Sequence, residues 1–202
     1  DMNVSMQDGF NIAWKLGLVA SGHARPDLLR TYHLERQPAA ENLIKFDREW
    51  SKLMATPQSE LDDPDAVEKY YVEAEEFAAG MLTSYSENLI TGSTEFQHLA
   101  PGFPVGRRFK SARAMRRCDA NQLHLGHQHT ADGRWRIYVF ADSNALNDDS
   151  PTNKLGEWLA SSDSPITRFT PADCDDNARF DAHVIYQQDH HSYEVTDAPQ
   201  VF

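Results

Sequence analysis

The sequence is poor in cysteine and in positive charge, and it has no long apolar run. Its two cysteines, Cys118 and Cys174, lie far apart and form no Cys-x-x-Cys motif. A disulfide framework and a cysteine-based zinc site are therefore not expected, and a reduced, cytoplasmic setting is the default. The 19 lysines and arginines against 31 acids give a formal charge of −12, which argues against nucleic acid or an anionic membrane as a partner. No apolar stretch approaches the roughly 18 residues that a membrane-spanning helix needs.

Several catalytic motifs are also missing. The sequence contains no G-x-G-x-x-G, no P-loop and no G-x-S-x-G. These motifs are the usual signatures of dinucleotide binding, phosphate binding and serine hydrolases. No Cys–His pairing can be read from the spacing either. The chain by itself is expected to hold no complete catalytic apparatus, and no catalytic residue is assigned.

The first element predicted is a helix over residues 4–21. Asn3 and Ser5 are good N-cap residues, Ser5-x-x-Asp8 resembles a capping box, and Gly22 suits the position after a helix end. A narrow polar stripe is formed by Gln7, Asp8, Asn11 and Lys15, and most of the remaining circumference is apolar. Such a helix is expected inside a larger domain.

Further helices are expected up to the middle of the chain. Pro26 begins a short helix, and Pro38 is predicted to end it because the residue before proline avoids the α region. A third helix is expected from residue 39 onwards. A polar connection ending in Asp63-Pro64-Asp65 should start a long amphipathic helix with apolar residues from Val67 to Tyr85.

The character of the sequence changes after the Pro- and Gly-rich stretch HLAPGFPVG. Strands are expected over NQLHLGH, WRIYVFAD and DAHVIYQ, a turn over ADGR, and a helix over NKLGEWLAS. This mixture over about 105 residues predicts a compact α/β domain.

Two histidine clusters and one basic run are candidate sites. His124, His127 and His129 lie close in sequence, but on a strand only His127 and His129 would share a face. Asp189, His190 and His191 are expected in a loop after a strand, without the other carboxylates that a metal-dependent phosphoesterase needs. No metal site is therefore expected. The run RRFKSARAMRR is expected to make an intramolecular or subunit contact in so acidic a chain.

The front end of the first helix is the exception among these candidates. Met2 and Asn3 lie there, where a helix exposes unpaired N–H groups and a partial positive charge. Such an end suits an anion, or a carbonyl that gains negative charge. The alternative is an ordinary capped core helix.

The first fifty residues resemble a known family. In order, they match its pattern M-N-x-x-x-x-D-x-x-N-L-x-W-K-L followed by L-x-x-Y-x-x-E-R-x-P. The matching residues are Met2, Asn3, Asp8, Asn11, Trp14, Lys15 and Leu16, then Leu29, Tyr32, Glu35, Arg36 and Pro38. The pattern is similar to that of flavoprotein aromatic hydroxylases of the phenol 2-monooxygenase and 3-hydroxybenzoate 4-monooxygenase type. Ile12 replaces the usual Leu, and Asp1 stands where the family has a Gly.

The second half resembles the same family. PGFPVGRRFKSARAMRR, LHLGH and DGRWRIYVFAD are similar to the start of its C-terminal thioredoxin-like domain, which in the family helps to form the dimer and lacks the redox Cys pair. The resemblance implies an α/β chain in three parts. Residues 1–56 would be the C-terminal helices of an FAD-binding domain of the p-hydroxybenzoate-hydroxylase type, 57–97 a connecting helical segment, and 98–202 a thioredoxin-like domain, incomplete at its end.

The resemblance also implies a chemistry. Members of the family use NADPH and FAD to hydroxylate a phenolic ring, such as phenol or hydroxybenzoate, through a flavin hydroperoxide, in the catabolism of aromatic compounds. Met2 and Asn3 would bind the cofactor, stabilising the anionic N1–C2=O edge of reduced flavin. Glu35 and Arg36 would tie helices together. The chain alone, a fragment of such an enzyme, would be inactive, and the competing hypothesis is a non-catalytic thioredoxin-like assembly module.

Overall fold

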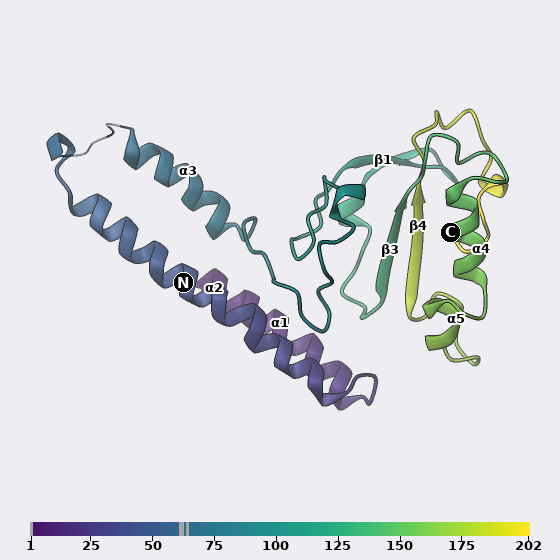
Figure 1. The fold of residues 1–202 in the computed structure, drawn as a ribbon, viewed down its shortest axis with the longest axis horizontal. Helices are drawn as coiled ribbons and strands as arrows, with labels where there is room; N and C mark the ends of the chain where they lie inside the picture. The colour runs from purple at the N-terminus through teal and green to yellow at the C-terminus, as the bar shows by residue number, and fades with distance from the viewer. Residues whose placement is uncertain (1, 61–62, 64) are drawn as a thin grey trace. The chain divides into compact units, whose positions relative to one another are not determined.

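The protein consists of two compact units, Asp1–Phe109 and Lys110–Phe202. The structure, a computed structural model, describes residues 2–60, 63 and 65–202. It combines helices and strands, as the sequence predicts (Figure 1). Within the described residues, no helix combines the length and apolar character needed to cross a membrane.

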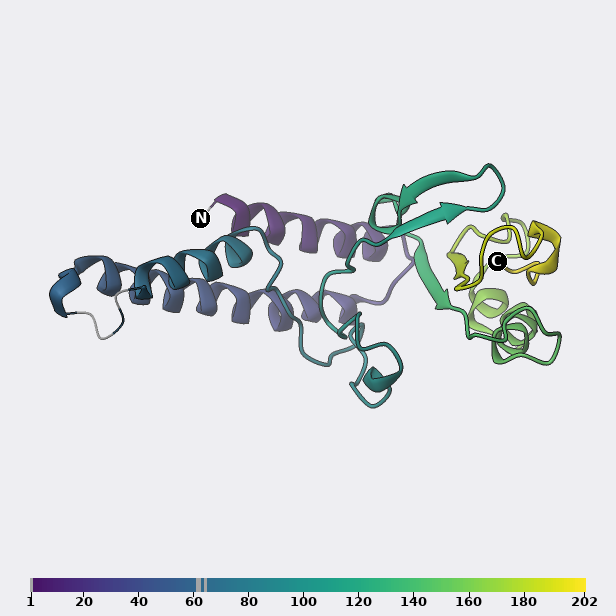
Figure 2. The same cartoon turned by 90° about the horizontal axis from the view of Figure 1, so that it is seen from above.

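The first unit is built on helices α1 (Met2–Ala20), α2 (Arg30–Ala55) and α3 (Ala66–Ala78). Figures 1 and 2 show α1 beside the first half of α2 and α3 beside its second half. Short 3₁₀ turns η1 (Pro26–Leu29), η2 (Gln58–Glu60) and η3 (Gln97–Leu99) lie between or after these helices. From residue 79 to the end of the unit the chain is otherwise irregular.

The end of α1 follows the sequence prediction, but its start does not. Gly22 has φ +75°, its N–H donates to Val19, and the N–H of His23 donates to Leu18 at 2.8 Å, which is a Schellman motif. Because the helix already includes Met2, Asn3 and Ser5 lie inside it, and the predicted N-caps and capping box are wrong. Asp1 lies outside the described residues.

The predicted break at Pro38 is also wrong, since α2 runs unbroken through it. Proline inside a helix removes one backbone hydrogen bond and crowds the carbonyl four residues earlier, at a cost of about 3 kcal/mol. The second half of α2 packs on α3 by stacking Phe46 and Trp50 against Tyr70, at 5.1 and 5.6 Å between ring centroids. Tertiary contacts on both sides of Pro38 thus outweigh the local preference.

The long amphipathic helix predicted after Asp65 corresponds to α3 and is shorter than expected. It ends at Ala78, and residues up to Tyr85 have left the helix. Gly80, with φ +74°, follows its end. Of the predicted start signal Asp63-Pro64-Asp65, Pro64 lies outside the described residues, while the Asp63 carboxylate accepts from the Asp65 N–H at 2.9 Å and from Lys69 at 2.7 Å.

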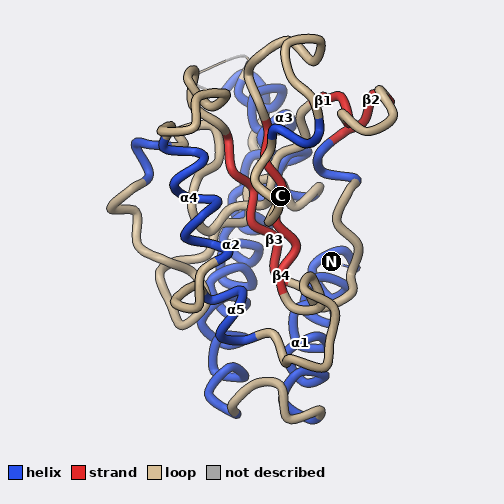
Figure 3. Tube along the Cα trace, turned by 90° about the vertical axis from the view of Figure 1, so that its right-hand side faces the viewer, coloured by secondary structure: helices blue, strands red, loops and turns tan. Residues whose placement is uncertain are grey.

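The second unit contains two small sheets. Strands β1 (Arg113–Arg116) and β2 (Asn121–His124) form an antiparallel hairpin, with Arg113 opposite His124. Strands β3 (Trp135–Phe140) and β4 (Phe180–Ile185) pair in parallel, from Trp135 opposite Phe180 to Phe140 opposite Ile185. Figure 3 shows these two strands side by side. The expected strands at β2, β3 and β4 are confirmed, whereas β1 falls in the basic run.

Two helices connect the parallel strands, as a parallel pair requires. They are α4 (Pro151–Ala160), which the sequence predicts, and the short α5 (Pro165–Phe169). Ser150 and Ser164 cap them, each accepting a backbone N–H three residues on, and each is followed by proline at the first helical position. The 3₁₀ turns η4 (Leu125–His127) and η5 (Val195–Asp197) complete this unit.

The predicted ADGR turn before β3 is confirmed and is held by its aspartate. Gly133 has φ +80°, and the Asp132 carboxylate accepts from the Arg134 N–H at 3.0 Å and from both Arg136 Nη atoms at 2.6 and 2.7 Å. The hydrogen bond from Arg136, followed by that from the Arg134 backbone, lowers the pKa of Asp132 far below its usual range. The turn is therefore an ion-paired anchor for the first residues of β3.

Candidate functional site

Helices α1 and α2 meet through their polar side chains. Asn11 and Lys15 on α1 are buried, as are Thr31, Glu35 and Arg36 on α2. In contrast, apolar α1 side chains such as Met6, Phe10 and Leu16 are 59%, 67% and 48% exposed. The narrow polar stripe read from the sequence is thus the face that packs on α2, and the wide apolar face lies open in this chain.

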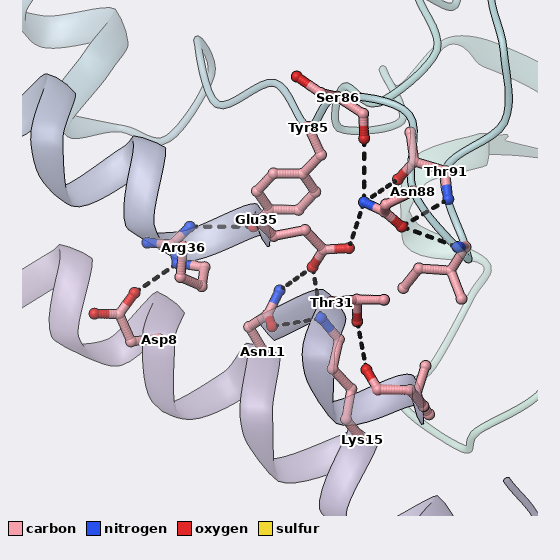
Figure 4. A network of polar contacts seen from close by, with 12 residues as sticks. Asp8, Asn11, Lys15, Thr31, Glu35, Arg36, Tyr85, Ser86, Asn88 and Thr91 are labelled. Atoms are coloured by element: carbon pink, nitrogen blue, oxygen red, sulfur yellow. Dashed lines mark hydrogen bonds and ion pairs between the residues drawn. The ribbon is translucent and has the colours of Figure 1, made fainter. Parts of the chain in front are cut away.

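Glu35 is the centre of this contact (Figure 4). Its Oε2 accepts from Lys15 Nζ at 2.6 Å and from Asn11 Nδ2 at 2.7 Å, while Lys15 Nζ also donates to Asn11 Oδ1 at 2.7 Å. The side chains of Lys15 and Glu35 are 0% and 2% exposed. A fully buried ion pair of this kind survives only with its additional hydrogen bonds in place, and the amide of Asn11 supplies them.

Arg36 forms a second contact to α1. Its Nε donates to Asp8 Oδ1 at 2.5 Å and its Nη2 to Gln7 Oε1 at 3.3 Å. Burial by itself would lower the pKa of Arg36, but the hydrogen bonds with Asp8 and Tyr85 outweigh it and raise the pKa. The guanidinium is therefore held charged although the side chain is buried.

The segment after α3 reaches the same two residues of α2. Asn88 Nδ2 donates to Glu35 Oε1 at 3.4 Å, and Arg36 Nη1 donates to the Tyr85 hydroxyl at 3.1 Å. Asn88 Oδ1 in turn accepts the N–H groups of Ile90 and Thr91 at 2.9 and 3.1 Å, which closes an Asx turn. Figure 4 shows these side chains converging from α1, α2 and the 85–91 segment.

A cleft of about 1040 Å³ lies between α1 and this segment. Its lining includes Asn3 in the first turn of α1 and three aromatic residues, Phe10, Trp14 and Tyr85. Its other lining residues are Met6, Gln7, Asn11, Glu35, Ala79, Gly80, Thr83, Ile90, Thr91, Gly92, Val105, Gly106, Arg107 and Arg108. The volume and the mixed aromatic and polar lining are those of a small-molecule or cofactor site.

Met2 and Asn3, the two residues that the sequence analysis proposed for cofactor binding, both lie in the first turn of α1. Met2 is 75% exposed, and Asn3 lines the cleft. Because the helix begins at Met2, the N–H groups of its first turn have no carbonyl partner four residues earlier in the helix. The cleft is thus lined, at Asn3, by the electropositive end of a helix.

The histidines of the second unit separate into two places. His124 ends β2 and His127 ends η4, with 5.4 Å between their ring centroids. The strand expected over NQLHLGH stops at His124, so the alternation of a strand does not extend to His127 and His129. Asp189, His190 and His191 bring ligand atoms within 4.8 Å of one another, largely on the surface. The expected absence of a metal site stays a prediction. Cys118 and Cys174 are free and exposed.

Sequence reasoning missed Tyr85 and Asn88. They lie 49 and 53 residues from their partners on α2, and nothing in a single sequence links positions so far apart. One local signal was available, since Asn88-x-x-Thr91 is typical of an Asx turn. This signal predicts the turn but not the contact of Asn88 with the Glu35 carboxylate.

Known proteins match both parts of the chain. Residues 2–47 match a family described as FAD binding domain, and residues 83–202 match one described as phenol hydroxylase, C-terminal dimerisation domain. The 3-hydroxybenzoate 4-monooxygenase of Comamonas testosteroni is 45% identical over 193 residues, which cover 93% of this chain and 30% of that protein.

Two fungal proteins match less closely. The FAD-dependent monooxygenase terD of Aspergillus terreus is 35% identical, over 100% of this chain and 34% of that protein. The phenol 2-monooxygenase fsqG of Aspergillus fumigatus is 34% identical, over 79% of this chain and 28% of that protein. The chain therefore spans about a third of the length of the curated relatives that it matches.

These matches confirm the resemblance seen in the sequence motifs. The dimerisation-domain match alone covers more than half of the chain, and the buried contact of α1 and α2 lies in the part that matches an FAD-binding domain. The chain belongs to the phenol hydroxylase family of flavoprotein aromatic hydroxylases and corresponds to a C-terminal portion of such a protein.

Proposed function

We propose that the protein carrying this chain is an FAD-dependent monooxygenase that uses NADPH and oxygen to hydroxylate a phenolic ring, such as phenol or a hydroxybenzoate. The observation that carries the proposal is the aromatic-lined cleft beside α1, whose lining residues from Asn3 to Glu35 lie in the part of the chain that matches an FAD-binding domain. The relatives support it, because their names include 3-hydroxybenzoate 4-monooxygenase and phenol 2-monooxygenase. The free cysteines favour a cytoplasmic location.

The first turn of α1 fits a flavin. Its N–H groups point out of the positive end of the helix dipole, and the described residues of the first turn include no acidic side chain. Met2 and Asn3 would hold the pyrimidine edge of FAD through their backbone N–H groups. When bound, FAD would supply the group that accepts electrons from NADPH and activates oxygen. The end of the helix would stabilise negative charge on the flavin ring.

The role of the helix end predicts a difference between two substitutions of Asn3. Asn3→Pro removes one backbone N–H in a first turn that tolerates proline, whereas Asn3→Ala removes only the side chain. We expect Asn3→Pro to raise the Kd for FAD of the full-length protein by about 2- to 30-fold, and Asn3→Ala by less than about twofold. Flavin fluorescence titration of the apoprotein measures both, with far-UV circular dichroism as a check on helix content.

Two outcomes would contradict the proposal. A full-length protein that purifies without FAD, and binds none when it is added, would reject the flavoprotein assignment. A protein that binds FAD but gives no phenol-dependent or hydroxybenzoate-dependent oxidation of NADPH would reject the proposed reaction. The chain 1–202 alone is expected to bind FAD weakly and to show no hydroxylase activity.

The match to a dimerisation domain favours a second function, in assembly. We propose a homodimer formed through a thioredoxin-like domain over residues 98–202, with residues 1–56 belonging to the FAD-binding domain and 57–97 connecting them. The parallel pair β3–β4 with α4 and α5 between its strands supports a thioredoxin-like arrangement, and the absence of a Cys-x-x-Cys motif supports a role without redox chemistry.

Removal of residues 98–202 from the full-length protein tests the assembly role. We expect the mass in solution, measured by light scattering after gel filtration, to fall from that of a dimer to that of a monomer. The matched control is the Cys118→Ser/Cys174→Ser variant, which should remain dimeric. A truncated protein that still forms the dimer would reject the association role.

A further inference from the structure

Two consecutive residues of α2 each contact two separate segments of the first unit. Glu35 contacts Asn11 and Lys15 of α1 through Oε2 and Asn88 through Oε1. Arg36 contacts Asp8 through Nε and Tyr85 through Nη1. In Figure 4 both side chains lie between α1 and the 85–91 segment, and we call this pair with its partners the clamp.

The two segments that the clamp joins are the two walls of the cleft. Asn3, Phe10 and Trp14 line it from α1, and Tyr85, Ile90 and Thr91 line it from the other side. The second wall contains no regular helix or strand. Backbone hydrogen bonds, such as that from the Tyr85 N–H to the Gly106 carbonyl, hold the wall internally, and the side-chain contacts to Glu35 and Arg36 connect it to α2.

The contacts of the second wall have a defined chemistry. The Asn88 amide donates to a carboxylate oxygen while its own oxygen accepts two backbone N–H groups. The Tyr85 hydroxyl accepts from a guanidinium that is 3% exposed. Hydrogen bonds to charged partners that are shielded from water are stronger than neutral ones. The contact from Arg36 to Tyr85, at 3.1 Å, is the shorter, and that from Asn88 to Glu35 is 3.4 Å long. Together they connect the segment to α2 at two points that are three residues apart.

We propose that Glu35 and Arg36 are positioning residues for the cofactor: they set the distance between the 85–91 segment and the first turns of α1, and so the fit of the cleft to the ring system of FAD. This inference rests on the proposed function. The clamp residues act through Tyr85, which lines the cleft, and through Asn88, whose side chain holds the lining residues Ile90 and Thr91 in a turn.

The test removes the contacts to the second wall and leaves those between the helices intact. Tyr85→Phe deletes the hydroxyl that Arg36 contacts, and Asn88→Ala deletes the amide that Glu35 contacts. In the full-length apoprotein, we expect the double variant to bind FAD about tenfold more weakly than the unaltered protein. The visible absorption bands of the bound flavin should also shift, because the environment of its ring has changed.

The matched control is Tyr70→Phe. It deletes a tyrosine hydroxyl of the same unit that donates to the Phe46 carbonyl at 3.1 Å, and Tyr70 does not line the cleft. We expect the Kd for FAD and the flavin spectrum of this variant to match those of the unaltered protein within about twofold. Comparison of this control with the double variant separates weaker FAD binding caused by a general loss of stability from weaker binding caused by a change in the cleft.

The outcomes are distinguishable. FAD binding by the double variant that equals that of the unaltered protein, with an unshifted spectrum, would overturn the inference and leave the proposed function standing. An unaltered protein without FAD would overturn both. Should the double variant not fold, Tyr85→Phe alone carries the test, with a loss of about threefold expected and unchanged affinity as the contrary result.

Discussion

The Lys15→Met substitution is expected to destabilise the protein by about 3–5 kcal/mol, because it leaves the Glu35 carboxylate buried without its cation. Lys15 is 0% exposed, and its Nζ lies 2.6 Å from Glu35 Oε2. Methionine has a similar length and fills the space, so the loss comes from the unpaired charge rather than from a cavity. Urea unfolding of the purified protein, followed by amide hydrogen exchange in α1, measures the effect.

A second substitution separates charge from packing. In Lys15→Met/Glu35→Gln no charge remains unpaired, and the glutamine amide can still bond to Asn11 and Asn88. We expect more than half of the lost stability to return. The matched control is Lys45→Met on α2, which breaks an exposed pair with Glu49 at 3.9 Å and should cost about 0.5 kcal/mol or less. Equal losses in Lys15→Met and Lys45→Met would show that the buried pair has no special weight.

Gly106→Ala is expected to cost about 2–4 kcal/mol and to distort the second wall of the cleft. Gly106 has φ +77°, and a Cβ there would lie 2.0 Å from the Tyr85 carbonyl oxygen. The two chains would have to separate, which breaks the hydrogen bond from the Tyr85 N–H to the Gly106 carbonyl at 2.9 Å and the bridge between Ser84 and Arg107. The loss should appear in the denaturation midpoint and as faster hydrogen exchange at Tyr85.

Gly22→Ala is the control for the backbone conformation alone. Gly22 has φ +75°, close to that of Gly106, but no atom lies within 4 Å of the position of its Cβ. It should cost only the left-handed strain, about 1–2 kcal/mol. A Gly106→Ala variant no less stable than Gly22→Ala would mean that the 84–85 and 106–107 backbones are not in close contact.

The site has an unusual distribution of polarity, and this explains why the largest effects fall on charged residues. In most helical pairs the apolar faces meet. Here Lys15, Glu35 and Arg36 lie between α1 and α2, whereas Phe10 and Leu16 are exposed. Specific hydrogen bonds therefore fix the register of the two helices, and that register places the first turn of α1.

The sequence predicted the elements whose local signals agree with one another. The Gly22 helix end, the strands β2, β3 and β4, and helix α4 follow from capping residues, β-branched and aromatic runs and turn residues. It failed at Pro38 and at the start of α1, where single-residue preferences of a few kcal/mol compete with tertiary packing. The domain limits 1–56, 57–97 and 98–202 stay predictions.

The site was predictable only in part. Motif resemblance placed Met2 and Asn3 at a helix front and Glu35 and Arg36 between helices, and in the structure Glu35 and Arg36 do join α1 to α2. The contribution of Tyr85 and Asn88 could not be predicted, because a contact across about fifty residues depends on the path of the whole chain.

By itself, then, the sequence determined the local elements and the family, because capping, periodicity and fixed motif positions are written in neighbouring residues. Tertiary structure alone decided that the polar stripe of α1 faces inward, that α2 continues through Pro38, and that the 85–91 segment closes on Glu35 and Arg36. For Pro38 the reason is the aromatic packing of α2 on α3, and for the other two it is the burial of charge. A buried charge must find its partners wherever they lie in the chain, and the cost of leaving it unpaired exceeds the local preferences that a sequence reveals.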